Sequence, residues 1–241
     1  AQANPAMGIR ISQEYIANEY ASMFGDRGFW IERLGVGDWP STSVQSARLI
    51  EPWAWDACRD VESFADDPVT FAFDVTPDRS AACIAAAGFR PDGNMHIEVI
   101  EHRTGTRWVA ERLEELKKRH RARTIWTDSY GPAGSILPEL ERRRIDVTSL
   151  SGKQMAAACG SFYDAIVDSQ TIRHLGTPEL DAAVATATTR NLGDAWAWAR
   201  RNTAVDISPL VACTIALYGL QNTRSGRSRI VSLADLDLDA A

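Results

Sequence analysis

The stretch VTFAFDVT at residues 69–76 decides the fold, because it places one charged residue inside an otherwise apolar strand. Strict alternation puts Phe71 and Phe73 on one face of this strand and Ala72 with Asp74 on the other. A buried carboxylate is costly unless it meets a cation or hydrogen-bond donors. Asp74 is therefore the first candidate for a functional side chain.

Two more strand-like segments follow directly, SAACIAAAGF at residues 80–89 and MHIEVIEH at residues 95–102. The turn sequences TPDRS and RPDGN separate the three segments. Short turns between consecutive strands predict an antiparallel meander. The next segment, residues 106–120, has apolar residues on one helical face and charges on the others, which predicts an amphipathic helix.

The second half of the chain alternates between strand and helix patterns. TIWTDS at residues 124–129 reads as a short buried strand, residues 134–144 as a helix and residues 145–150 as another strand. Further helices are expected at 153–169, after Thr177-Pro178-Glu179 and after Ser208-Pro209, with a strand at 195–201. Alternating elements of this kind predict a parallel part of the sheet, so the fold class is a mixed α/β sheet flanked by helices.

Composition limits the function only weakly. The 241 residues are 45% hydrophobic and 24% charged, as in an ordinary globular protein, and the formal net charge is -6. That charge argues against a protein that coats nucleic acid through bulk positive charge, but not against a nuclease with a carboxylate site that binds metal. The four cysteines form no CxxC pair, which indicates buried thiols in a reducing compartment. No apolar run of membrane-spanning length and no signal peptide is visible, so we expect a cytoplasmic protein without a membrane partner.

The common catalytic motifs are missing from the sequence. Gly152-Lys153 is the one Gly-Lys pair, and Val147 occupies the place where a P-loop needs its first glycine. The chain also contains no HExxH, no GxSxG and no GxGxxG after a strand. The remaining candidates for chemistry are aspartates near the ends of strands.

Asp128 ends its strand as Asp74 does, and Asp206 lies just before the last helix. If the two strands are neighbours, the carboxylates of Asp74 and Asp128 converge and share a divalent cation. The alternative is that each acid caps a strand or meets an arginine. For Asp206 the alternatives are capping of the helix or membership of the metal cluster.

Weaker candidates have simpler explanations. Asp78 suits the turn in which it lies, and an isolated histidine such as His174 is more often structural than a ligand. Lys153 and Arg79 are candidates for phosphate contacts, but the chain has 26 basic residues to choose from.

Taken in order, these segments resemble the nuclease domain of the large terminase subunit of tailed phages. FAFDVTPDRSAACIAAAG (71–88) is similar to the first hairpin of that family with its metal-binding aspartate, and IWTDSYGPAG (125–134) to the later strand with the second. SGKQMAAACGSFYDAIVDSQTIRHLGTPELDAAV (151–184) is similar to the next helix, histidine and helix, and VDISPLVACTIALYGL (205–220) to the closing helix. NPAMGIRIS (4–12) to FWIERLG (29–35) resembles the stretch between motor and nuclease.

The resemblance implies a ribonuclease H-like sheet whose acids bind two divalent cations, Mg²⁺ or Mn²⁺. Asp74 and Asp128 match the first two ligands. Many relatives carry the third aspartate at the position of Ser208, two residues after Asp206. Either Asp206 therefore serves, or Asp181 or Asp78 takes its place.

The implied activity is an endonuclease that cuts concatemeric double-stranded viral DNA during packaging, by two-metal hydrolysis. The implied partners are the terminase ATPase domain, the small terminase subunit and the portal protein, in the cytoplasm of a host bacterium. Alternatives are another ribonuclease H-like nuclease of transposase or resolvase type, and a non-catalytic domain that engages portal or motor. The expected division is a lead-in from the ATPase domain at 1–67, the nuclease at 68–220 and a flexible tail at 221–241.

Overall fold

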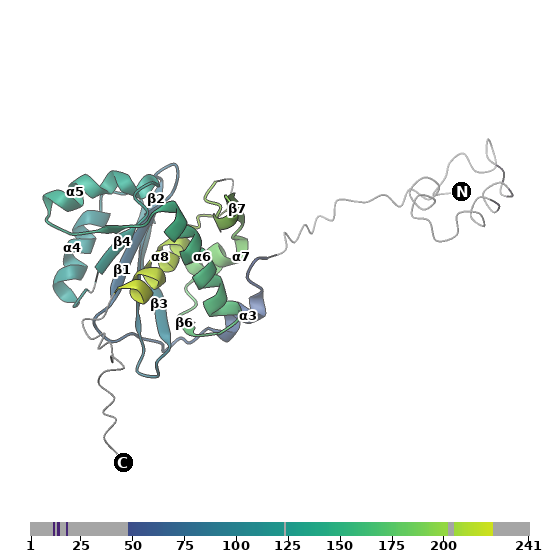
Figure 1. The fold of residues 1–241 in the computed structure, drawn as a ribbon, viewed down its shortest axis with the longest axis horizontal. Coiled ribbons are helices and arrows are strands. Elements are labelled where there is room, and N and C mark those ends of the chain that lie inside the picture. The colour runs from purple at the N-terminus through teal and green to yellow at the C-terminus, as the bar shows by residue number, and fades with distance from the viewer. Residues whose placement is uncertain are drawn as a thin grey trace, which may run out of the picture. The chain divides into compact units, whose positions relative to one another are not determined.

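A six-stranded mixed sheet forms the centre of the protein in a computed structural model (Figure 1). The model describes residues 48–122, 124–201 and 205–223, together with Ser12, Glu14 and Asn18. The chain divides into two units, residues 1–47 and 48–241, and the fold described below belongs to the second. The expected tail from residue 224 onward and nearly all of the expected lead-in before residue 48 lie outside the described residues.

The first three strands form the predicted antiparallel meander, and the outer strands add to it in parallel. The strand order is β5-β4-β1-β2-β3-β6, in which β1 pairs with β2 and β2 with β3 antiparallel, while β4, β5 and β6 join by parallel pairing. The strands are β1 (Thr70–Val75), β2 (Ala81–Phe89), β3 (Met95–Thr104), β4 (Thr124–Thr127), β5 (Thr148–Ser149) and β6 (Ile172–His174). The mixed sheet expected from the sequence is confirmed.

The register of the strands brings polar residues into one row across the sheet. Asp74 on β1 lies opposite Cys83 on β2, and Cys83 lies opposite His102 on β3. Ala72 pairs with Trp126 in the parallel β1–β4 ladder. Asp128 and Asp74 each follow that pair by two residues, so the two aspartates lie at the same level on neighbouring strands.

The two faces of the sheet bury different residues, as the alternation in VTFAFDVT requires. Phe71 and Phe73 pack with helices α4 (Val109–Arg119), η1 (Pro132–Ile136) and α5 (Leu137–Arg142). Ala72 belongs to the opposite core, which is built on helices α3 (Pro52–Ala57), α6 (Gly152–Val167), α7 (Pro178–Thr186) and α8 (Ser208–Asn222). Since Asp74 shares the face of β1 that carries Ala72, it lies on the side of the sheet that α8 covers. Figure 1 shows α8 crossing the sheet.

Helix α8 lies unusually close to the strands. Most of its residues are buried, and it runs over the alanine-rich strand β2. A Cβ atom on Gly219 would come within 2.6 Å of the Trp126 ring, so this position requires glycine. The close approach holds the last turn of α8 against the start of β1, while Asp206, which precedes the first turn, lies beside Asp74 and Val75 at the end of β1.

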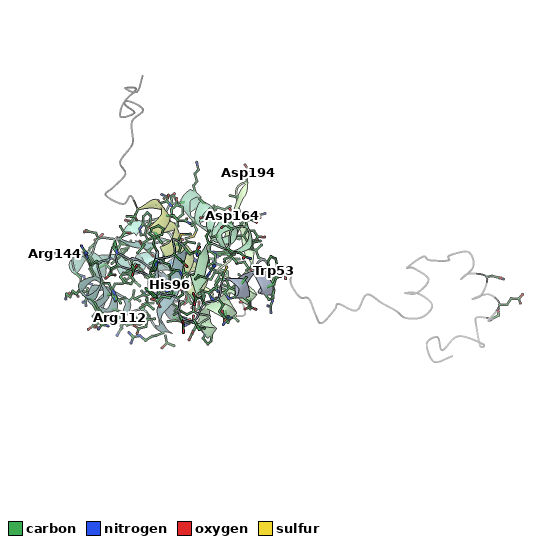
Figure 2. All side chains as sticks on the ribbon, turned by 90° about the horizontal axis from the view of Figure 1, so that it is seen from below. Trp53, His96, Arg112, Arg144, Asp164 and Asp194 are labelled. Atoms are coloured by element: carbon green, nitrogen blue, oxygen red, sulfur yellow. The ribbon has the colours of Figure 1, made fainter. Side chains whose placement is uncertain are left out.

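One short strand, β7, and one helix boundary differ from expectation in this region. The pattern at residues 180–190 predicts one helix, but α7 ends at Thr186 and the chain continues as strand β7 (Thr189–Leu192). Threonine is β-branched and favours a strand, which explains why the TATT stretch leaves the helix. Strand β7 forms a hairpin with β8 (Ala195–Trp198) through Gly193, whose φ is 63°. Asp194 lies at the tip of this hairpin (Figure 2).

In the parts of the chain that the structure describes, no helix is long and apolar enough to cross a membrane. The predicted domain boundaries at residues 67 and 220 stay predictions.

Candidate metal centre

Asp74 is buried at the end of β1 with 1% of its surface exposed. Its Oδ1 lies 3.2 Å from Nη2 of Arg200, yet this oxygen has no hydrogen-bond partner among the described residues. Burial raises the pKa of Asp74 to about 6, and the nearby Arg200 and the Val75 backbone N–H oppose that shift only in part. Arg200 therefore compensates only part of the cost of burying the Asp74 carboxylate.

Asp128 follows β4 and lies beside Asp74. Its Oδ2 accepts a hydrogen bond from Nη1 of Arg200 at 2.8 Å, and its Oδ1 accepts one from the backbone N–H of Tyr130 at 3.1 Å. Thr127, the residue before it, donates its hydroxyl to the carbonyl of Phe73 at 2.9 Å. That bond ties the end of β4 to the end of β1, so both aspartates are held on a rigid edge.

Arg200, which is not among the residues predicted from the sequence, bridges the two acids. The residue follows β8, and its side chain is 15% exposed. One terminal nitrogen faces each carboxylate, but Nη2 forms no hydrogen bond with a described residue. The stretch AWAWARR at residues 195–201 predicts a strand. An arginine at the end of an apolar strand is also a signal, because burying its charge is as costly as burying that of Asp74.

Asp206 lies just before α8 and lines the same cavity as Asp74. It accepts hydrogen bonds from Nε2 of His102 at 2.8 Å and from the backbone N–H of Ser208 at 2.7 Å. Burial alone would raise the pKa of Asp206, but the hydrogen bonds from His102 and Ser208 hold it below its usual value. The hydrogen bond from Ser208 ties Asp206 to the first residue of α8, whose N-cap position is occupied by Ile207.

The cavity at this edge of the sheet has a volume of about 580 Å³ and an open side. It is lined by Asp74, Val75, Thr76, Pro77, Asp78, Ser80, Arg200, Arg201, Val205, Asp206, Ile207 and Ser208. Two of the three predicted ligands thus line one cavity, and the third, Asp128, joins them through Arg200.

The weaker candidates from the sequence either bind within their own turn, lie away from the cavity or are exposed. Asp78 lines the cavity but binds its own turn, where the Ser80 backbone N–H and hydroxyl lower its pKa to about 2. Asp181 accepts hydrogen bonds from Trp55 and Arg59, away from the cavity lining. Lys153 is exposed in the first turn of α6.

His174 and Arg79 also have structural partners. Nδ1 of His174 accepts the Gly176 backbone N–H at 3.1 Å, and its Nε2 bonds the Trp55 carbonyl at 2.9 Å. Arg79 donates to the hydroxyls of Ser135 and Thr106. These contacts account for both side chains without a ligand.

The donors at this site suit a hard divalent cation. Carboxylate oxygens are the ligands that Mg²⁺ and Mn²⁺ prefer. Oδ1 of Asp74 is buried and accepts no hydrogen bond from a described residue, so it is an acceptor available to such an ion. Within the described residues, no group of three or more His, Cys, Asp or Glu side chains is arranged to hold a metal ion. Arg200 lies between Asp74 and Asp128, while Asp206 faces His102 and Ser208.

The fold is similar to the crystal structure of the HK97 bacteriophage large terminase, with a TM-score of 0.59 and 12% sequence identity. That similarity covers 90% of this chain and 52% of the terminase, so the chain spans about half the length of that protein. Neither a family model nor a curated protein sequence matches the chain.

Two nuclease structures are similar at lower scores. The large terminase nuclease from thermophilic phage G20c with bound magnesium has a TM-score of 0.49 and 12% identity, over 66% of this chain and 85% of that one. The nuclease domain of the large terminase subunit gp2 of bacterial virus Sf6 has a TM-score of 0.49 and 13% identity, over 73% and 99%. Because both scores are below 0.5, the inference about the fold rests on HK97.

Sheet topology and strand-end acids together define an α/β protein with the ribonuclease H-like fold. More particularly, the fold is similar to that of about half of the HK97 bacteriophage large terminase, which confirms, at the level of the fold, the resemblance seen in the sequence.

Proposed function

We propose that this chain is a divalent-metal-dependent endonuclease that cuts concatemeric double-stranded viral DNA during genome packaging. One observation carries the proposal: Asp74 and Asp128 lie side by side at the ends of parallel strands, beside an open cavity, and a single arginine, Arg200, pairs with both. The large terminase fold of the chain gives this acid pair its context.

We assign Asp74, Asp128 and Asp206 as the residues that hold two ions of Mg²⁺ or Mn²⁺. Asp206 is favoured over Asp181 because it lines the cavity with Asp74, whereas Asp181 is engaged by Trp55 and Arg59. It is favoured over Asp78 because its position before α8 is fixed by the packing of that helix on the sheet.

Ions held by Asp74, Asp128 and Asp206 would supply an activated water and charge stabilisation for the leaving 3′ oxygen, so no protein nucleophile would be needed. The protein contributes rigid positions for the carboxylates. The Thr127–Phe73 hydrogen bond holds the two strand ends together, and His102 and Ser208 orient Asp206. The open side of the cavity leaves room for a phosphate to approach the acids.

The partners proposed with this activity are double-stranded DNA, the terminase ATPase domain, the small terminase subunit and the portal protein. The similarity covers 52% of the HK97 protein, so these partners are part of the proposal. The proposed place of action is the cytoplasm of a host bacterium.

Cleavage of supercoiled plasmid by the purified chain in Mn²⁺, with and without EDTA, tests the proposal. Asp74→Asn and Asp128→Asn should lose cleavage, while Asp168→Asn, an exposed acid at the end of α6, should keep it. If the folded protein binds Mn²⁺ but nicks DNA no faster than Asp74→Asn does, the endonuclease assignment is wrong for this chain.

A further inference from the structure

Arg200 occupies the space between the two acids that are expected to bind metal. Among the described residues it is the one cation paired with both, with nitrogens 3.2 Å from Asp74 Oδ1 and 2.8 Å from Asp128 Oδ2. A divalent cation binds carboxylate oxygen at ~2.1 Å. An ion bound to both oxygens would lie in contact with the guanidinium, and two cations repel strongly where solvent is scarce. The guanidinium and a bridging ion therefore exclude each other.

The contact between Arg200 and Asp74 is poorly made for a permanent structural pair. Neither Arg200 Nη2 nor Asp74 Oδ1 has a hydrogen-bond partner among the described residues, although both atoms are buried. A buried arginine that serves only stability normally satisfies its donors, often with a bidentate carboxylate. Only the half of the bridge that reaches Asp128 is a hydrogen bond.

The loop after Asp128 is shaped to admit the guanidinium. A Cβ atom on Gly131 would come within 2.7 Å of Arg200 Nη1. Because the φ of Gly131 is -89°, any residue could adopt this backbone, so the conformation itself does not require glycine. The guanidinium of Arg200 fits in its observed place only while residue 131 has no side chain.

We propose that Arg200 is an internal counter-ion that occupies the cation position of the metal-free site, and that divalent ions bind by displacing its guanidinium. This inference rests on the proposed function, since it concerns the metals of the same site. The arginine neutralises part of the acid pair in the absence of metal and sets a threshold of metal concentration below which the site stays closed to ions. Removal of Arg200 then strengthens metal binding instead of weakening it.

Titration calorimetry of Mn²⁺ into the full 241-residue chain tests the inference without any measurement of cleavage. Arg200→Gln should bind Mn²⁺ about tenfold more tightly than the unchanged chain, a difference of about 1.4 kcal/mol. Arg201→Gln is the matched control, because Arg201 lines the same cavity and carries the same charge. Its affinity should change by less than about twofold, because an exposed charge is screened.

Each outcome has a distinct meaning. Arg200→Gln with equal or weaker affinity overturns the counter-ion role and leaves the proposed metal site intact. An equal gain in Arg201→Gln also overturns it, because the effect would then be one of general charge. Adding Asp74→Asn to Arg200→Gln should abolish the binding, and binding that survives would place the ion elsewhere and refute the inference. If neither the unchanged chain nor Arg200→Gln binds Mn²⁺, the metal site and the inference fall together.

Gly131→Ala provides a second test should Arg200→Gln fail to fold. The added methyl group meets Arg200 Nη1 at 2.7 Å and Asp128 Oδ2 at 3.3 Å, so the flexible arginine must withdraw while its charge remains in the protein. We expect tighter Mn²⁺ binding for Gly131→Ala. Affinity that is unchanged or weaker would overturn the displacement.

Discussion

Two polar clusters lie on the side of the sheet that α8 covers, and they differ in how many of their polar atoms have hydrogen-bond partners. The acid cluster consists of Asp74, Asp128 and Arg200. The histidine cluster consists of His174, Trp55 and Asp181. Asp74, Asp128 and His174 are all candidates from the sequence, but the environments of the two clusters are opposite.

The histidine cluster satisfies its members completely. The ring of His174 stacks on Trp55 with centroids 3.7 Å apart, and both ring nitrogens have partners. Because Nδ1 accepts the Gly176 N–H, Nε2 carries the proton and donates it to the Trp55 carbonyl. Burial lowers the pKa of His174, so the ring is held neutral.

The acid cluster leaves atoms unsatisfied next to a cavity. Asp74 Oδ1 and Arg200 Nη2 are buried without hydrogen bonds among the described residues, and the cavity opens beside them. Strain of this kind persists only where the surrounding structure imposes it, and it is typical of a functional site. The comparison teaches that the unsatisfied cluster is the one to test for ligand binding, and the satisfied one for stability.

The largest expected effect separates the two clusters by activity. Asp74→Asn should lower metal-dependent DNA cleavage at least about 1000-fold, because metal ions contribute several kcal/mol to charge stabilisation in the transition state. The thermal shift induced by Mn²⁺ should disappear as well, while the protein without metal stays folded. Plasmid nicking rates and melting curves measure both effects. A normal Mn²⁺ shift in this variant would remove Asp74 from the metal site.

The histidine cluster should respond in the opposite way. His174→Ala leaves a cavity, breaks the stack on Trp55 and leaves a buried carbonyl without its donor, so the free energy of unfolding should fall by about 4 kcal/mol. Mn²⁺ affinity of the folded protein should not change. Urea unfolding measures the loss. Trp53→Ala is the control, because Trp53 lies on α3, the helix that carries Trp55, and is 62% exposed (Figure 2). Weaker Mn²⁺ binding by folded His174→Ala would contradict a purely structural role.

Most of the fold could be predicted because its signals are local. The alternation in VTFAFDVT gave the two faces of β1, and the short turns gave the meander of β1, β2 and β3. The strands β6 and β7, with the sequences IRH and TRNL, could not be predicted in this way, because neither has the run of apolar residues that marks β4 (TIWT) and β8 (AWAW). Such short strands exist because of their neighbours in the sheet, and local propensity contributes little.

The candidate site could be predicted only for residues on regular strands. Asp74 and Asp128 stand out because each places a charge in or directly after an apolar strand. Arg200 meets them across 72 residues of chain from Asp128, a contact that no local pattern reveals. The partner of Asp206, His102, is likewise 104 residues away, so sequence spacing could not tell a helix cap from a metal ligand.

The pH dependence of stability should sharpen the difference between the clusters. Asp74 has a pKa of about 6 when folded, above its ordinary value of 3.8, so the folded protein binds more protons between these limits. Stability from this group is therefore present at low pH and is lost as the pH rises from about 4 to 6. Asp74→Asn removes the loss, and in EDTA its advantage over the unchanged chain should grow by about 3 kcal/mol across that window.

Urea unfolding of both proteins at pH 4, 5, 6 and 7 measures this advantage, with pH values chosen to bracket the window. Saturating Mn²⁺ should reverse the order at pH 7, because the ion then binds the ionised carboxylate of Asp74, which Asp74→Asn lacks, and stabilises the folded unchanged chain. An advantage that does not change between pH 4 and pH 7 would mean that Asp74 is ionised in the folded protein throughout.

The smallest effect distinguishes the two remaining candidates for the third ligand. Asp181 accepts hydrogen bonds from Trp55 Nε1 at 2.7 Å and Arg59 Nη2 at 2.9 Å at a partly exposed position, so Asp181→Asn should cost about 1 kcal/mol of stability. Cleavage by the folded protein should be unaffected. Asp206→Asn should reduce cleavage and Mn²⁺ affinity far more than stability, because Asp206 lines the cavity with Asp74. If instead Asp181→Asn abolishes cleavage and Asp206→Asn spares it, the third ligand comes from α7 and belongs to the histidine cluster. The division between a binding cluster and a structural one then no longer holds.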